Sequence, residues 1–131
     1  MTEHLGIAAQ LAAARATLDR VTALRAHQEA AGGAVLVDTR TTPQRDRDGT
    51  VPGALVIERN HLEWRCDPGS GASVPEATDT GVRWILFCDE GYASSLAAAS
   101  LRSLGLHRAT DLIGGFQSWR AAGLPLTPPK R

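Results

Sequence analysis

Four short apolar runs divide the central part of this 131-residue chain. Each run is rich in Val, Ile or Leu, is shorter than an ordinary helix, and is followed by polar or glycine-containing residues. This pattern is typical of buried strands in a parallel sheet. The runs are AVLVD at 34–38, ALVI at 54–57, VRWILFC at 82–88 and ATDLI at 109–113.

Helical patterns surround and separate these runs. Over residues 5–30, apolar residues recur every three or four positions, which predicts one N-terminal helix that ends at a Gly-Gly pair. A second strong helical pattern covers 93–104. The alternation predicts an α/β fold with an open, mainly parallel sheet and right-handed crossovers. We expect the N-terminal helix (1–31) to pack on one main domain (32–127) and the tail (128–131) to be frayed.

Composition narrows the classes of function. Fourteen Lys and Arg balance fourteen Asp and Glu, so the chain offers no electrostatic footprint for nucleic acid or an anionic membrane surface. The N-terminus has no continuous hydrophobic run, and we expect a cytoplasmic protein. Two cysteines, Cys66 and Cys88, are too few for a disulfide framework, and no histidine has metal-site spacing to them. The sequence therefore predicts no metal and no cofactor.

Cys88 directly ends the third apolar run. In an open α/β sheet, ligands bind beyond the carboxyl ends of the strands, so this position suits a site. The loop from Cys88 to Ser94 leads into a helix, and its backbone N–H groups together with the helix N-terminus would favour the thiolate, which is the nucleophilic form. The same donors would stabilise an anion built on the sulfur. Gly91 fits the positive φ that so tight a loop needs.

Other residues around this loop have simpler interpretations. A cysteine at a strand end, taken alone, is more often a small buried hydrophobe than a nucleophile. Ser94 and Ser95 are predicted to cap the following helix, because their hydroxyls can bond free N–H groups in its first turn; the alternative is a hydroxyl that donates to the Cys88 thiolate. Trp84 and Trp119 are predicted to pack in the core. Cys66, in the polar loop before the third run, is either a resolving thiol or incidental.

Four motifs together resemble the rhodanese-like family. They are LVDTR, GTVPGALVI, CDEGYAS and LIGGFQSWRAAGLPL, which occur in this order over about residues 34–126. The resemblance implies the three-layer rhodanese-like fold, with a mainly parallel central sheet flanked by helices. It also implies a sulfurtransferase mechanism in which Cys88 accepts a sulfane sulfur as a persulfide and transfers it to a thiol or another nucleophilic acceptor.

The resemblance further implies a substrate-binding loop and a set of partners. Arg45 is a candidate because it lies close to where two-domain members of the family carry a substrate-binding arginine. The partners would be a small sulfur donor and a thiol or protein acceptor. Whether the chain forms a homodimer through its N-terminal helix stays open. The candidate loop residues are Asp89, Glu90, Gly91, Tyr92, Ala93 and Ser94.

Two features depart from the family pattern. Ala93 stands where many members have a basic or hydroxyl residue. Asp89 and Glu90 place two negative charges beside the sulfur, and charges about 4 Å apart interact by roughly 4 kcal/mol at an effective dielectric near 20. Inward-facing carboxylates would therefore oppose an anionic donor such as thiosulfate. We hypothesise that both point outward and form an acidic rim suited to a cationic partner or an amine-bearing donor.

Two other functions compete with sulfur transfer. A catalytically weak or inactive rhodanese-like module would use the same fold for binding or regulation. A cysteine phosphatase or arsenate reductase would need a Cys-x5-Arg loop, in which the arginine clamps a tetrahedral oxyanion. Here the sixth residue after Cys88 is Ser94, which disfavours that chemistry.

Overall fold

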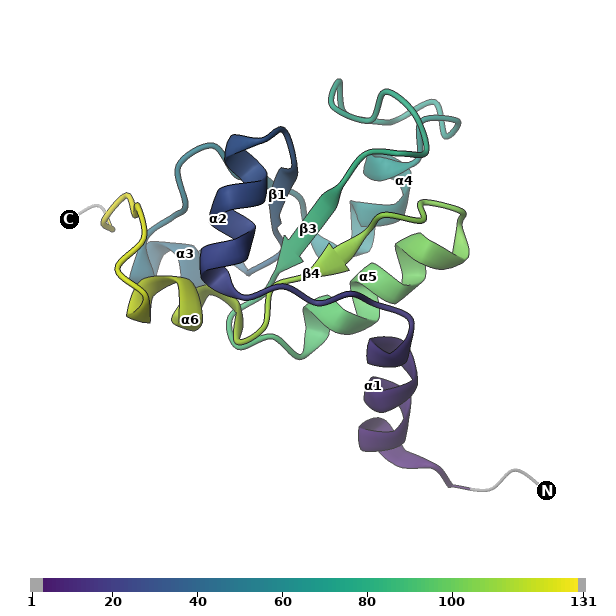
Figure 1. The fold of residues 1–131 in the computed structure, drawn as a ribbon, viewed down its shortest axis with the longest axis horizontal. Coiled ribbons are helices and arrows are strands. Elements are labelled where there is room, and N and C mark those ends of the chain that lie inside the picture. Colours follow the sequence, from purple (N-terminus) through teal and green to yellow (C-terminus); the bar gives the residue numbers. More distant parts are fainter. Residues whose placement is uncertain (1–3, 130–131) are drawn as a thin grey trace.

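The computed structural model describes residues 4–129. Within this range the chain forms a parallel four-stranded sheet in the order β2-β1-β3-β4, with helices on both sides (Figure 1). All four predicted strands are present, and the α/β fold class is confirmed. The strands are β1 (Val35–Asp38), β2 (Leu55–Val56), β3 (Trp84–Phe87) and β4 (Thr110–Asp111).

The strand register places the carboxyl ends of β1 and β3 side by side at the same end of the sheet. Val35 lies opposite Trp84 and Asp38 opposite Phe87, so the residues that follow β1 and β3 leave the sheet at the same edge. Side chains alternate along each strand and therefore point to opposite faces. Both predicted core tryptophans are buried.

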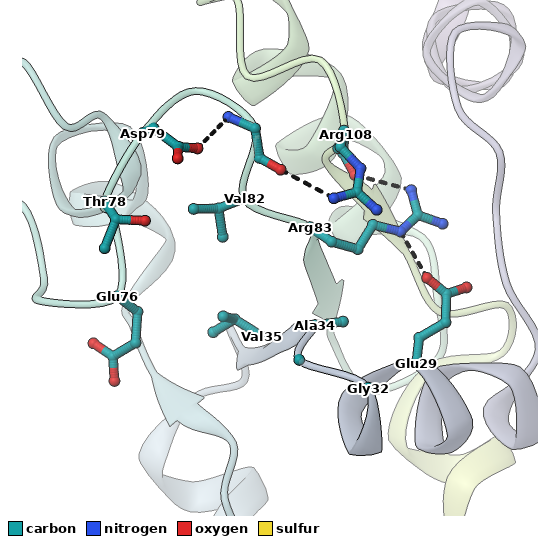
Figure 2. A pocket seen from close by; sticks show the side chains of 12 residues that line it. Glu29, Gly32, Ala34, Val35, Glu76, Thr78, Asp79, Val82, Arg83 and Arg108 are labelled. Carbon is teal, nitrogen blue, oxygen red and sulfur yellow. Dashed lines mark hydrogen bonds and ion pairs between the residues drawn. The ribbon is translucent and has the colours of Figure 1, made fainter.

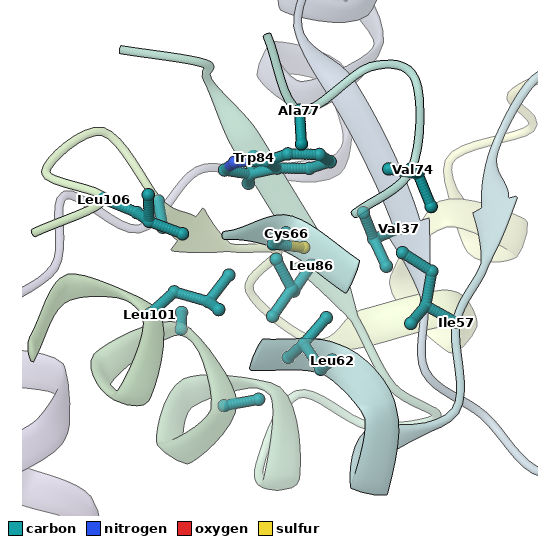
Figure 3. Close-up of a cluster of buried hydrophobic side chains, with 13 residues drawn as sticks. Val37, Ile57, Leu62, Cys66, Val74, Ala77, Trp84, Leu86, Leu101 and Leu106 are labelled. Carbon is teal, nitrogen blue, oxygen red and sulfur yellow. The ribbon is translucent and has the colours of Figure 1, made fainter. Parts of the chain in front are cut away.

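Each face of the sheet carries its own apolar cluster. On one face, α2 (Ala23–Ala31) and α6 (Gly115–Ala121) pack on the sheet, with Phe116 and Trp119 fully buried or nearly so. The other face is covered by α4 (Leu62–Cys66) and α5 (Ala93–Ser103) (Figure 3). The second cluster includes Val37, Leu62, Cys66, Trp84, Leu86, Leu101 and Leu106.

The N-terminal region differs from the sequence prediction of a single helix. It forms two helices, α1 (Gly6–Ala16) and α2, because residues 17–22 run beside β4 instead. Val21 makes a parallel bridge with Leu112, donates its N–H to Asp111 O at 3.1 Å, and so covers the sheet edge. Thr22 then caps α2. Helical periodicity continued through this segment, but a long-range backbone pairing overrides it.

The remaining elements lie outside the sheet and its two main pairs of covering helices. Helix α1 packs against α5, to one side of the main body (Figure 1). The short helix α3 (Thr42–Asp48) begins with a capping box, and η1 (Arg59–His61) leads into α4. Thr127 pairs with Thr50, and of the predicted frayed tail, 130–131 lie outside the described residues. No described helix is long and apolar enough to cross a membrane.

Candidate active site

Cys88 lies between β3 and α5, with a half-buried side chain. The N–H of Gly91 donates to its Sγ at 3.2 Å, and the N–H of Ser94 donates at 3.4 Å. Two backbone donors therefore converge on the sulfur, as the sequence predicted for this loop. Backbone N–H groups arranged in this way can donate hydrogen bonds to an anion built on the sulfur.

The first turn of α6, which begins at the Gly-Gly pair, holds the start of this loop. Phe116 N–H donates to Cys88 O at 2.9 Å, and Gln117 N–H donates to Asp89 O at 3.1 Å. The approach is so close that a Cβ on Gly115 would lie 2.6 Å from Cys88 O. Two of the four sequence motifs thus interlock directly, and the carbonyls at the start of the loop face α6.

A buried carboxylate, that of Asp111, binds the residues at the end of this loop. It ends β4 and is fully buried, and its Oδ2 accepts hydrogen bonds from the hydroxyls of Ser94 and Ser95, each at 2.8 Å. The predicted helix caps are therefore wrong: the cap position is Tyr92, which makes no side-chain cap bond. The serine hydroxyls bind Asp111 instead, because both serines already lie inside the first turn of α5.

Two arginines from the N-terminal segment complete this network, and the sequence did not point to them. Arg20 pairs with Asp111, with its Nε 2.8 Å from Oδ1. The Nη2 atoms of Arg15 and Arg20 both donate to the carbonyl of Gly91, at 2.8 and 3.0 Å. An acid at the end of a strand, as in ATDLI, was the available signal for Asp111. No local signal marked the arginines.

The Ser94 hydroxyl lies between the thiol and the carboxylate. Its Oγ is 2.8 Å from Asp111 Oδ2 and 3.4 Å from Cys88 Sγ. A hydroxyl has one proton, and an ionised carboxylate is the stronger acceptor. The Ser94 proton therefore points to Asp111, and an oxygen lone pair faces the Cys88 S–H.

With this geometry established, comparisons with known proteins identify the family. Residues 20–122 match the family model for the rhodanese-like domain. This chain belongs to the rhodanese-like family. A sulfurtransferase of Allochromatium vinosum is 30% identical over 96 residues, which cover 73% of this chain and 80% of that protein.

Solved structures agree with this assignment. A Rhodopseudomonas palustris protein of unknown function, named a possible tyrosine phosphatase, is 32% identical with a TM-score of 0.84, covering 96% of this chain and 97% of that one. A human single-domain sulfurtransferase is 27% identical with a TM-score of 0.65, covering 78% and 95%. The rhodanese-like fold and a kinship with sulfurtransferases are therefore established, and α1 lies outside the residues that match the family model.

The two acidic residues of this rhodanese-like loop have different surroundings. The Asp89 carboxylate accepts hydrogen bonds from Gln117 Nε2 at 2.9 Å and from Arg47 Nη2 at 3.4 Å, so it is directed to α6 and α3. Glu90 is exposed. Arg47 also bonds Asp48 at 2.7 Å, and this hydrogen bond is the main cause that lowers the pKa of Asp48 to about 2. Arg47 thus offsets the charge of Asp89, while Glu90 lies at the rim.

Arg45 lines a hollow at the carboxyl ends of the strands, the same end of the sheet at which Cys88 lies. Its guanidinium donates to Arg40 O and, at 3.1 Å, to Thr42 Oγ1. The hollow, of about 450 Å³, is formed by residues 39–43, Arg45 and residues 58–60, which follow β1 and β2. Thr39 N–H donates to Phe87 O at 2.9 Å, which ties one wall to the residue before Cys88. None of the residues that line the hollow belongs to the Cys88 loop, and Arg45 makes no hydrogen bond to the sulfur.

The other loop candidates and Arg40 have clear positions. Tyr92 and Ala93 are exposed at the start of α5, and the Tyr92 ring lies 5.5 Å from the Arg15 guanidinium. Arg40 is fully buried, pairs with Asp38 at 2.8 Å, and stacks 3.7 Å from the Phe116 ring. Arg40 therefore fixes the end of β1 and does not face the solvent near the sulfur.

A larger hollow, of about 600 Å³, lies at the opposite end of the strands (Figure 2). Val35 begins β1 there, far along the sheet from Cys88. Arg83 in its wall bonds Glu29 at 2.9 Å, and this hydrogen bond is the main cause that lowers the pKa of Glu29. Asp79 accepts from Gly81 N–H at 2.7 Å. These charged and polar groups bind one another, so size alone does not make this hollow the site.

Cys66 is a core residue and does not reach the candidate site. It is fully buried at the end of α4 and packs beside Leu62, Trp84 and Leu86 (Figure 3). Burial, with a smaller contribution from Glu63, raises the pKa of its thiol to about 12. Such a thiol stays protonated at neutral pH, so the structure favours the incidental interpretation over the resolving one. No cluster of metal-binding side chains occurs among residues 4–129.

Proposed function

We propose that this protein is a sulfurtransferase that carries sulfane sulfur as a persulfide on Cys88 and transfers it to a thiol or another nucleophilic acceptor. The observation that carries the proposal is the convergence of the Gly91 and Ser94 N–H groups on Sγ, at 3.2 and 3.4 Å. Kinship with sulfurtransferases supports it.

The chemistry has two substitution steps at sulfur. In the first, the Cys88 thiolate attacks the sulfane sulfur of a donor. A new S–S bond forms, the bond between that sulfur and the rest of the donor breaks, and the leaving group takes the electron pair. In the second, an acceptor thiolate attacks the outer sulfur, and Cys88 leaves as a thiolate. The loop amides stabilise the negative charge on sulfur at each stage.

We further propose how the loop selects its donor. The donor enters from the hollow beside Arg45, and the backbone from Asp89 to Ser94 surrounds the sulfur that it delivers, with Tyr92 and Ala93 at the mouth. The Asp89 charge is offset by Arg47, whereas Glu90 remains at the rim. Glu90 therefore disfavours a doubly charged donor such as thiosulfate and favours a donor that carries an amine.

Mass spectrometry of the intact protein tests the proposal. After incubation with 3-mercaptopyruvate, thiosulfate or an inorganic polysulfide, we expect a gain of one sulfur atom that a reducing agent removes. Cys88→Ser should abolish the gain, and the matched variant Cys66→Ala should keep it. Absence of the adduct with all three donors would contradict sulfur transfer and support a binding or regulatory module.

Phosphatase chemistry is the competing activity that a structural relative's name suggests. The sixth residue after the nucleophile is Ser94, and the nearby guanidiniums of Arg15 and Arg20 bind the Gly91 carbonyl. An oxyanion clamp of the Cys-x5-Arg type is therefore lacking in this loop. We expect no hydrolysis of p-nitrophenyl phosphate, and a hydrolysis that Cys88→Ser abolishes would replace our proposal.

A further inference from the structure

Arg15 joins α1 to the Cys88 loop, although α1 lies outside the residues that match the family. Its guanidinium makes two hydrogen bonds at once: Nη2 donates to Gly91 O at 2.8 Å, and Nε donates to Ser95 Oγ at 3.1 Å. The same group lies 5.5 Å from the Tyr92 ring. One side chain of α1 therefore contacts three residues of the loop and the first turn of α5.

The Gly91 carbonyl is held by two charged donors. Arg20 adds its own hydrogen bond at 3.0 Å, and its position is fixed by the ion pair with buried Asp111. Hydrogen bonds from a guanidinium to a carbonyl are stronger than bonds between neutral groups. The carbonyl is therefore firmly directed to the N-terminal segment.

The two hydrogen bonds to the Gly91 carbonyl determine the orientation of the peptide group between Gly91 and Tyr92. In a trans peptide the C=O and the following N–H point to opposite sides, so the Tyr92 N–H points away from the arginines. It has no acceptor among the described residues. Gly91 has φ +88, and the freedom of glycine would otherwise allow this peptide to turn. A turned peptide would present its oxygen, a repulsive group, where the amide now is.

We propose that Arg15 is a positioning residue, which holds the Gly91 carbonyl and thereby keeps the loop in the conformation in which the Gly91 and Ser94 N–H groups face an anion on Cys88. Helix α1 is thereby part of the active site of this rhodanese-like chain. The role toward a persulfide rests on the proposed function, whereas the role toward the Cys88 thiolate does not.

The test compares three full-length variants in a Cys66→Ala background: Arg15→Gln, Arg15→Lys and the control Arg25→Gln. Arg25 is another arginine of the N-terminal region, and it pairs with Glu29 on the surface at 3.0 Å. The first measurement is the rate of Cys88 alkylation by iodoacetamide as a function of pH. The second is the lifetime of the persulfide by intact mass. Melting temperature and the Tyr92 amide resonance report on folding and on the loop.

We expect Arg15→Gln to slow alkylation at neutral pH by about three- to tenfold, to move the rate profile to higher pH, and to shorten the persulfide lifetime by a similar factor. Arg15→Lys keeps the charge but replaces the planar guanidinium fork with a single, freely rotating nitrogen on a shorter side chain, so it should show an intermediate loss. Arg25→Gln should match the parent. If Arg15→Gln does not fold, Arg15→Lys and the Tyr92 resonance decide the question.

Several results would overturn the proposal. An unchanged rate profile in folded Arg15→Gln would show that the contact is only structural. Full activity in Arg15→Lys with a loss in Arg15→Gln would show that charge, and not positioning, acts on the sulfur. If the parent accepts sulfur from no donor while Arg15→Gln still shifts the alkylation profile, the proposed function fails and the positioning role stands.

Discussion

Replacing Gly91 with alanine would test how closely the Cys88 loop and the Gly-Gly turn must pack. Gly91 has φ +88, and a Cβ at this position would lie 2.7 Å from Gly114 N and 3.2 Å from Gly115 N. Both neighbours are backbone atoms, which cannot rotate away. Gly105 is a matched control, because it has φ +92 but no heavy atom within 4 Å of the equivalent Cβ.

The magnitude follows from separating two costs. Both variants place alanine in the left-handed region, which costs about 1 to 2 kcal/mol. Only Gly91→Ala also forces the loop away from the Gly-Gly turn, and overpacking of this kind costs about 1 to 3 kcal/mol more. We therefore expect the free energy of unfolding to fall by about 1 kcal/mol in Gly105→Ala and by about 3 kcal/mol in Gly91→Ala.

Urea denaturation measures both losses, and iodoacetamide alkylation of the native proteins reports on the sulfur. The Gly91 N–H donates to Sγ at 3.2 Å, so a displaced loop should also slow alkylation of Cys88. Gly105→Ala should alkylate at the parent rate. Equal losses of stability in the two variants, or a normal alkylation rate in Gly91→Ala, would refute the claimed close packing.

Three further predictions concern ionisable side chains. Burial raises the pKa of Cys66 from 9.0 to about 12, so the contribution of its thiol to the free energy of unfolding should be full below pH 9 and lost as the pH rises toward 12. In urea titrations at different pH values, Cys66→Ala should flatten this fall in stability. The pKa of Asp48 is lowered from 3.8 to about 2, so Asp48→Asn should cost about 1 kcal/mol at neutral pH, and the difference should vanish as the pH falls from 3.8 through 2. Glu90→Lys should raise kcat/KM for thiosulfate by about two- to fivefold. Asp89→Asn should have less effect, because Arg47 already offsets the charge of Asp89. Equal effects of the two variants would contradict the different surroundings of the two carboxylates.

The strands and the place of Cys88 in the fold were predictable from local patterns. Each apolar run forms a strand. Because Cys88 directly follows one of these strands and the strands are parallel, it lies at the end of the sheet where all four strands have their carboxyl ends. The N-terminal helix was not predictable in the same way. Its periodicity continues through residues 17–22, but Val21 pairs with Leu112, which is distant in the sequence. Local pattern therefore failed where a distant strand supplied the competing partner.

By itself the sequence determined the four strands, the position of Cys88 after the third of them, and the glycine that its loop needs, since each depends on neighbouring residues. Only the tertiary structure decided what surrounds the sulfur. Arg15 meets Gly91 across 76 residues and Arg20 meets Asp111 across 91. A buried charge or carbonyl is costly unless it has a hydrogen-bond partner, and here those partners are distant in the sequence. No local pattern encodes such contacts, so only the tertiary structure shows which residues support the Cys88 loop.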